Sequence, residues 1–191
     1  MHLPSSGWAQ QRCSSTSWPK LRVVSCRFGS LCRRSSELIR SRSCSIRAPA
    51  SLIVTPASRS SSPSIYRVTK SIWAHDEGVR IVAVEPAESA VLSGQPTGSH
   101  RIEGIGIGFT PPLWEPESVH EIETVSTADA WAMARRLARE EGIFAGASSG
   151  ANVAAALRVA ERLGPDATVV TIIVDFGLRY ISTGLYPADS L

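Results

Sequence analysis

Apolar and polar positions follow regular patterns from about residue 78 to the C-terminal end of the chain. A β-branched run over residues 79–84 is followed by Glu85-Pro86, a pattern that predicts a strand and then a break. Residues 168–174 form a continuous apolar run of the kind that is covered on both faces in a parallel sheet. Strands are therefore predicted over residues 79–84, 121–125, 143–145 and 168–174, the third of them very short and buried.

Two helices are predicted between these strands. In the first, Ser126 can cap the N-terminus with Asp129 at the capping-box position, and Gly142 ends the helix. Its apolar side chains recur at i, i+3 and i+4, at Ala130, Met133, Ala134, Leu137 and Ala138. The second helix is rich in alanine, covers about residues 151–163 and stops at Gly164-Pro165. The alternation predicts an α/β fold, a partial doubly wound parallel sheet with flanking helices.

The first 73 residues show neither the helical nor the strand period. Serine and arginine dominate runs such as residues 33–36 and 58–64. With so few apolar side chains per residue, burial cannot offset the entropy that is lost when the backbone is ordered. We therefore predict two parts: residues 1–73, a basic low-complexity segment that is disordered, and residues 74–191, a folded domain.

Charge divides the chain at nearly the same point. Residues 1–74 hold twelve Lys and Arg against one acid, and residues 75–191 hold eight Arg against sixteen acids, which gives net charges of +11 and −8. All four cysteines and both lysines, Lys20 and Lys70, lie in the first part. Three interpretations of that part compete. It is the product of a shifted reading frame, since its composition is typical of GC-rich codons read out of frame, or an organellar transit peptide, or an arm that binds nucleic acid through phosphates.

Composition sets several classes of protein aside. The longest aliphatic run, residues 169–174, is interrupted by Thr171 and falls far short of the roughly 20 apolar residues that span a bilayer. No apolar stretch follows the N-terminal charges, as a secretory signal requires. Neither Cys-x-x-Cys nor His-x-x-x-His occurs, so a structural zinc site has no support. We expect a cytoplasmic protein that binds no metal and contacts no membrane.

The most informative motif is the run of small residues from Gly146 to Asn152. Between a strand and a helix, such residues let backbone N–H groups point at a ligand, and the helix N-terminus favours an anion or a hydrogen-bond acceptor. Ser148 and Ser149 add hydroxyl groups at the same place. The alternative is that Ser149 merely caps the helix, and the local sequence leaves both interpretations open.

A second motif has alternate glycines over residues 104–108. Thr110-Pro111-Pro112 follows it instead of a helix, so the motif is not a dinucleotide-binding fingerprint. We expect a loop in which the backbone takes positive φ or approaches another element closely. The nearby acids and histidines have no metal-binding spacing and are expected to be solvated: His100, Glu103, His120 and Glu121.

Together these motifs resemble the C-terminal third to half of a known enzyme family. This is the cysteine synthase (O-acetylserine sulfhydrylase) and cystathionine β-synthase family, pyridoxal-phosphate enzymes of fold type II with the tryptophan-synthase-β-like fold. The similar stretches are residues 79–94, 100–109, 134–143, 146–152 and 175–183. The resemblance covers the chain from about Ala74 onward.

The resemblance implies a β-replacement that depends on pyridoxal 5'-phosphate. Its substrates would be O-acetylserine and sulfide, or homocysteine in a sibling branch, and the family implies a homodimer. Ser148 matches the serine whose hydroxyl bonds the pyridine nitrogen of the cofactor. A neutral hydroxyl there leaves the ring a weaker electron sink, which suits β-elimination and replacement. Gly104 and Gly106 match the family's glycine loop beside the substrate.

The family's other cofactor contacts have no counterpart in the sequence. Neither Lys20 nor Lys70 has the context of the family's Schiff-base lysine, and no Gly-Thr-rich phosphate loop precedes Val79. We therefore assign no catalytic residue and expect a truncated, catalytically impaired version of the enzyme. Two alternatives remain: a non-catalytic interaction module that docks on an intact homologue and, ranked below it, a protein that binds nucleic acid through residues 1–74.

Overall fold

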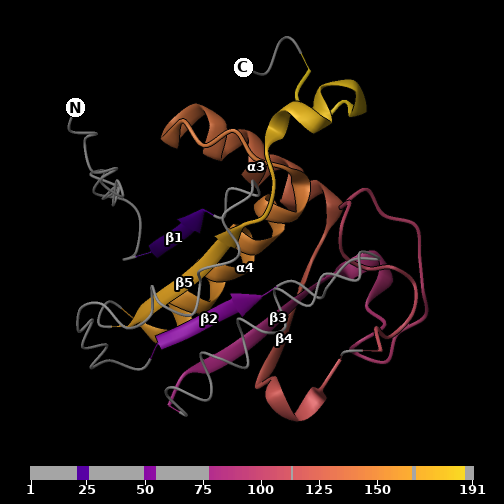
Figure 1. The fold of residues 1–191 in the computed structure, drawn as a ribbon, viewed down its shortest axis with the longest axis vertical. Coiled ribbons are helices and arrows are strands. Elements are labelled where there is room, and N and C mark those ends of the chain that lie inside the picture. The colour runs from indigo at the N-terminus through magenta and orange to yellow at the C-terminus, as the bar shows by residue number, and fades with distance from the viewer. Residues whose placement is uncertain (1–20, 26–49, 55–77, 113, 165–166, 188–191) are drawn as a thin grey trace, which may run out of the picture.

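A parallel sheet of five strands forms the centre of the fold (Figure 1). The computed structural model describes residues 21–25, 50–54, 78–112, 114–164 and 167–187. The strands are β1 (Leu21–Ser25), β2 (Ala50–Val54), β3 (Arg80–Pro86), β4 (Glu121–Val125) and β5 (Thr168–Ile173), in the spatial order β1-β5-β2-β3-β4. Every neighbouring pair is parallel, which confirms the predicted parallel sheet.

The structure departs from the expected N-terminal segment at two places, because β1 and β2 come from within residues 1–73. Both strands coincide with short apolar runs rich in β-branched residues, which favour strands but are too brief to show a period. β2 lies between β5 and β3, with Leu52 opposite both Ile81 and Val170. The rest of residues 1–73 lies outside the described residues, and the boundary at residue 74 stays a prediction.

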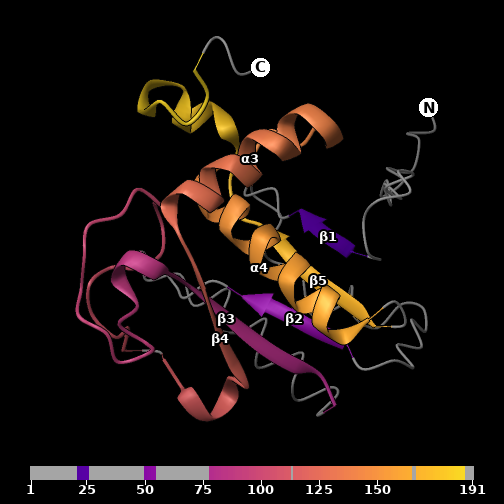
Figure 2. The same cartoon turned by 180° about the vertical axis from the view of Figure 1, so that it is seen from behind.

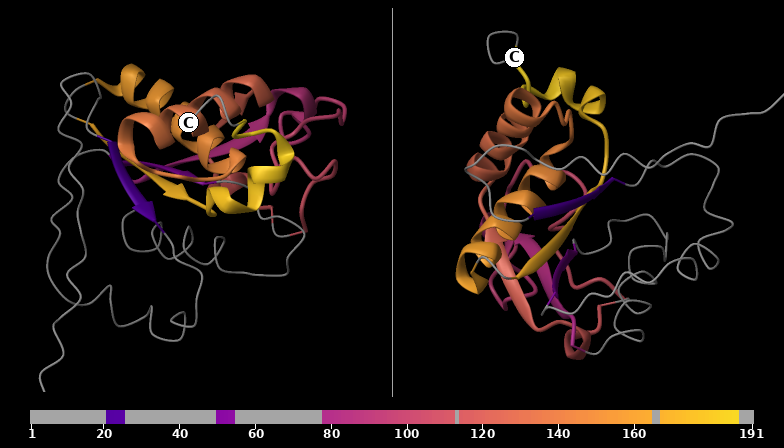
Figure 3. Two further views of the ribbon diagram at one scale, coloured as in Figure 1. Left: turned by 90° about the horizontal axis from the view of Figure 1, so that it is seen from above. Right: turned by 90° about the vertical axis from the view of Figure 1, so that its left-hand side faces the viewer.

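Two helices, α3 (Thr127–Glu141) and α4 (Ala147–Leu163), cover one face of the sheet. Seen from behind, α4 lies over the strands, roughly along β5, and α3 packs beside it (Figure 2). The view along the sheet shows both helices on the same side (Figure 3). The predicted start of α3 is confirmed, since Ser126 Oγ accepts the Asp129 amide at 3.1 Å. Its predicted end is confirmed too, because Gly142 adopts the left-handed φ of +66°.

The sequence prediction was wrong about the segment between the two helices. Helix α4 begins at Ala147, four residues earlier than expected, because the small residues after Gly146 are all compatible with a first helical turn. Residues 143–145 form no strand: Ala145 makes one isolated antiparallel bridge with Phe176. The chain therefore passes directly from α3 to α4 without entering the sheet.

The core lies between the sheet and α4. Every residue of β3 after Arg80 is buried, and α4 presents mostly alanines to the strands, so helix and sheet approach closely. The largest apolar side chains that are completely enclosed include Val82, Val84, Ile102, Val125, Val153, Val169 and Leu185. In the described part of the chain, none of the helices combines the length and hydropathy that a bilayer span requires.

Candidate active site

The first turn of α4 lies at the carboxyl end of β5. Val174, which follows the strand, donates its backbone N–H to Ser149 Oγ at 3.0 Å. In open parallel sheets, ligands bind outside the carboxyl ends of the strands. The small-residue motif predicted to carry the chemistry is therefore placed where such a fold offers a site.

The two serines of this turn have different roles. Ser149 is fully enclosed and its hydroxyl accepts the Val174 amide. The alternative that Ser149 caps the helix is therefore wrong: the N-cap is Gly146, and no side chain caps α4. Ser148 is only 2% exposed, yet none of the described residues forms a hydrogen bond with its hydroxyl. The Ser149 hydroxyl already binds the Val174 amide, so Ser148 is the serine of this turn that remains a candidate for ligand binding.

The loop over residues 104–108 reaches the same turn at Gly104. A Cβ added to Gly104 would lie 4.0 Å from Ser148 Oγ, in ordinary van der Waals contact. Gly106 lies elsewhere: a Cβ there would come within 2.4 Å of Pro86 Cγ, at the end of β3. Both glycines have positive φ, +94° and +62°, so the prediction of a loop with left-handed backbone is confirmed. Of the three predicted site residues, the structure brings Ser148 and Gly104 together and places Gly106 against the strand end.

The two histidines that were expected to be solvated are both engaged with the backbone. His100 is half-buried, with Nδ1 accepting the Ile102 amide at 3.2 Å and Nε2 lying 2.8 Å from the Gly106 carbonyl oxygen. His120 is exposed, but its Nδ1 accepts the Ile81 amide at 3.0 Å. Spacing between polar residues does not reveal such contacts with the backbone, whether the partner is two residues away, as Ile102 is from His100, or 39, as Ile81 is from His120. Within the described ranges, no three acids, histidines or cysteines gather as a metal site would require.

A carboxyl–phenol pair that the motifs did not single out packs against the start of α4. Tyr180 donates its hydroxyl to Asp175 Oδ2 at 2.5 Å, and a Cβ on Gly146 would lie 2.2 Å from Asp175 Oδ1. Oδ1 itself is buried and has no hydrogen-bond partner in the described part of the chain. Burial raises the pKa of the Asp175 carboxyl despite the opposing hydrogen bond from Tyr180, and burial together with Asp175 raises the pKa of the phenol.

Asp175 should make stability depend on pH. Its carboxyl pKa is higher in the folded protein than the ordinary 3.8, so folding takes up a proton between that pH and the raised value. The contribution of Asp175 to stability is thus complete below the unfolded pKa and is lost as the pH rises through the folded pKa. Asp175→Asn cannot titrate, so its free energy of unfolding relative to the unsubstituted protein should increase with pH across this window. Urea unfolding at a series of pH values measures the difference, and a difference that stays constant with pH would contradict the argument.

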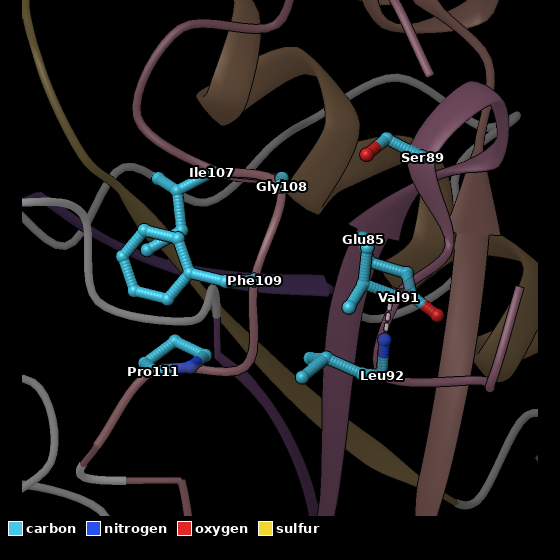
Figure 4. Close-up of a pocket in the computed structure, with 9 residues that line it drawn as sticks. Glu85, Ser89, Val91, Leu92, Ile107, Gly108, Phe109 and Pro111 are labelled. Carbon is cyan, nitrogen blue, oxygen red and sulfur yellow. Dashed lines mark hydrogen bonds between the residues drawn. The ribbon is translucent and has the colours of Figure 1, made fainter. Parts of the chain in front are cut away.

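A small pocket lies between the end of β3 and the glycine loop (Figure 4). The figure shows Ile107, Phe109 and Pro111 on one side, facing Val91, Leu92 and Ser89 on the other. Glu85, only 1% exposed, fixes the side of the pocket formed by residues 89–92 through hydrogen bonds to its carboxylate. Its oxygens accept the Leu92 amide at 2.8 Å, the Ser93 amide at 3.0 Å and the Ser93 hydroxyl at 2.5 Å. The pocket is lined by both apolar and polar residues, and the carboxylate of Glu85 already has its hydrogen-bond partners within the turn.

Comparisons with known proteins agree with this arrangement. A model of the family described as pyridoxal-phosphate dependent enzymes matches residues 47–175. A cysteine synthase of Staphylococcus aureus (strain Mu50) is 47% identical over 111 residues, 58% of this chain and 36% of the relative. A probable cysteine synthase of Bacillus subtilis is 46% identical over 108 residues, 56% of this chain and 35% of the relative.

Solved structures of two such enzymes share the fold. A cysteine synthase from Entamoeba histolytica superposes with a TM-score of 0.66 at 39% identity, covering 73% of this chain and 40% of that one. An O-acetylserine-dependent cystathionine β-synthase from Helicobacter pylori gives a TM-score of 0.64 at 33% identity, covering 73% and 44%. The fold-type-II architecture implied by the resemblance is therefore confirmed.

The extent of these matches differs from the extent of the motifs. The family match begins at residue 47 and includes β2, whereas the motifs begin near Ala74. The chain spans little more than a third of the curated relatives' length. The cysteine synthases match it over a stretch of about 110 residues, and the family match covers well over half of the chain. The protein therefore belongs to the family of pyridoxal-phosphate-dependent enzymes.

Proposed function

We propose that this chain forms one wall of the cofactor site in an enzyme that condenses O-acetylserine with sulfide to give cysteine. Pyridoxal phosphate is the cofactor of the family. The curated relatives that match the chain are named cysteine synthases, which supports this reaction over the interaction module or the nucleic-acid-binding protein. An amino-acid substrate and a homodimer belong to the same proposal.

The observation that carries the proposal is the free hydroxyl of Ser148. A pyridine nitrogen needs one hydrogen-bond partner, and Ser148, a residue only 2% exposed, supplies a hydroxyl in the first turn of α4. Gly104, which has no side chain, faces this hydroxyl from the glycine loop and leaves room beside it. The residues present therefore fit the ring-nitrogen side of the cofactor.

When bound, pyridoxal phosphate supplies an electron sink for bond changes at the amino-acid substrate. Ser148 would hold and orient the ring through a neutral hydroxyl. A carboxylate in its place would keep the ring nitrogen protonated, whereas a hydroxyl does not. This choice of partner favours elimination and replacement at the β-carbon of the substrate.

The neighbouring serine provides a matched control for the test of Ser148. Ser148→Ala should weaken the binding of pyridoxal phosphate by roughly three- to tenfold, the worth of one hydrogen bond, and leave stability nearly unchanged. Ser149→Ala should do the reverse: it leaves the Val174 amide unpaired, costing about 1–3 kcal/mol of stability, and spares the affinity. Fluorescence titration with pyridoxal phosphate and urea unfolding measure the two quantities. Equal affinity in wild type and Ser148→Ala would refute the role of Ser148.

We further propose that this chain alone has little activity. The enzyme needs an amine that holds the cofactor's aldehyde, and the two lysines of the chain, Lys20 and Lys70, both lie outside the described residues. Neither has the sequence context that the family's lysine has. Incubation with pyridoxal phosphate, borohydride reduction and peptide mapping should find neither lysine modified in stoichiometric amount. Full labelling of one of them, together with cysteine formation from O-acetylserine and sulfide, would overturn this part of the proposal.

A further inference from the structure

The imidazole of His100 holds the glycine loop at two points. Nδ1 accepts the Ile102 amide at 3.2 Å, and Nε2 lies 2.8 Å from the Gly106 carbonyl oxygen. An amide can only donate and a carbonyl can only accept, so Nδ1 must be bare and Nε2 must carry the proton. The two contacts therefore require the neutral ring with its proton on Nε2.

These two contacts bracket Gly104. Ile102 precedes Gly104 by two residues, Gly106 follows it by two, and Gly104 is the residue that faces Ser148 Oγ. Glycines with positive φ at residues 104, 106 and 108 give this loop little conformational preference of its own. The shape of the loop must therefore be imposed by contacts. The ring of His100 supplies two of them, one on each side of Gly104.

The surroundings fix the ring itself. A Cβ on Gly106 would lie 2.7 Å from His100 Nε2, so the ring and the loop backbone are in close contact. The next residue, Arg101, is tied to α3: its amide donates to Thr127 Oγ1 at 3.1 Å and its carbonyl accepts Trp131 Nε1 at 2.9 Å. Ile102 is completely enclosed in the core. The loop is thus anchored before Gly104 by α3 and the core, and after it by the His100 ring.

We propose that His100 is a positioning residue of the cofactor site, which keeps Gly104 against Ser148. Its described contacts are with the loop backbone, through which it would act. The inference rests on the proposed function for its effect on cofactor binding. Its effect on the loop can be measured without any cofactor.

Three substitutions separate the two contacts. In His100→Asn, the side-chain oxygen reaches the place of Nδ1 and keeps the Ile102 contact. In His100→Gln, the side-chain nitrogen reaches the place of Nε2 and keeps the Gly106 contact, and His100→Ala keeps neither. Exchange of the Ile102 amide with deuterium should be roughly tenfold faster in the Ala and Gln variants and close to wild type in the Asn variant.

Affinity for pyridoxal phosphate should decrease with the number of His100 contacts, to Ile102 and to Gly106, that a variant loses. It should fall by roughly tenfold in His100→Ala and less in the Asn and Gln variants. His120→Ala is the control, because it removes a similar contact, from Nδ1 to the Ile81 amide, at the opposite end of β3. It should speed exchange at Ile81 and leave the affinity unchanged.

Two results would overturn the inference. One is a His100→Ala protein with wild-type affinity for pyridoxal phosphate and wild-type exchange at the Ile102 amide. The other is an equal increase in Ile102 exchange and an equal loss of affinity in all three variants. If the unsubstituted protein does not bind pyridoxal phosphate at all, the proposed function fails. The exchange rates of Ile102 in the three variants then still decide whether His100 holds the loop.

Discussion

Replacing Gly150 by alanine should destabilise the protein by about 1–3 kcal/mol, although alanine is the better helix former. Gly150 lies in the first turns of α4, where alanine would normally be favoured by about 1 kcal/mol. A Cβ at this position, however, would lie 2.1 Å from the Ala130 carbonyl oxygen and 2.9 Å from the Ala134 nitrogen of α3. Both are backbone atoms, so the added methyl group can be accommodated only if the helices move apart.

Gly142 provides the control for this substitution. It also belongs to the helical pair but has a positive φ of +66° and nothing within 4 Å of an added Cβ. Gly142→Ala should therefore cost about 1–2 kcal/mol through backbone strain alone. Urea unfolding compares the two variants, and a Gly150→Ala protein that is as stable as wild type would show that α3 and α4 do not meet at this residue. Because Ser148 precedes Gly150 by two residues, the Gly150 variant should also bind pyridoxal phosphate less tightly.

The second large effect is expected at Glu85. Glu85→Gln should cost about 1.5–3 kcal/mol, the worth of a hydrogen bond to a charged group. One carboxylate oxygen accepts the Leu92 amide and the other accepts the amide and hydroxyl of Ser93. A glutamine in either orientation turns its NH₂ group toward one of these N–H donors. Since the residue is 1% exposed, water cannot replace the lost acceptor.

Ser93→Ala tests whether the carboxylate is responsible. This variant removes the hydroxyl and leaves both amide contacts to Glu85 intact, so it should lose only about 1 kcal/mol. The two variants are compared by urea or thermal unfolding. If Ser93→Ala proved the more damaging, the amide contacts of Glu85 could not be what holds the turn over residues 91–94.

Local patterns were sufficient for the elements that local chemistry determines. The cap at Ser126 and the left-handed end at Gly142 depend on residues within one helix turn, and both were predicted correctly. The start of α4 was not, because Gly146 has no capping side chain and the first turn is completed by a distant contact, from Val174 to Ser149. Strands β1 and β2 were missed because five-residue apolar runs in a serine-rich context show no period.

The site was only partly accessible to sequence reasoning. The resemblance pointed to Ser148 and Gly104, but their juxtaposition depends on the loop meeting α4 across more than forty residues of chain. The roles of Glu85, His100 and Asp175 were not predicted, since each depends on the loop or turn conformation that brings its partner, only a few residues away, within hydrogen-bond distance. The expectation that His100 is solvated failed, because its ring lies against the loop backbone, whereas His120 is exposed as expected.

The position of β2 has a practical consequence for anyone who shortens this chain. Among the described strands, β2 alone joins β5 to the β3–β4 pair. An expression fragment that starts near Ala74, where the recognisable motifs begin, would divide the sheet and leave rows of unsatisfied N–H and C=O groups on both inner borders. Such a fragment would be drawn into intermolecular strand pairing, and its insolubility would reflect the cut rather than a fault in the remaining sequence.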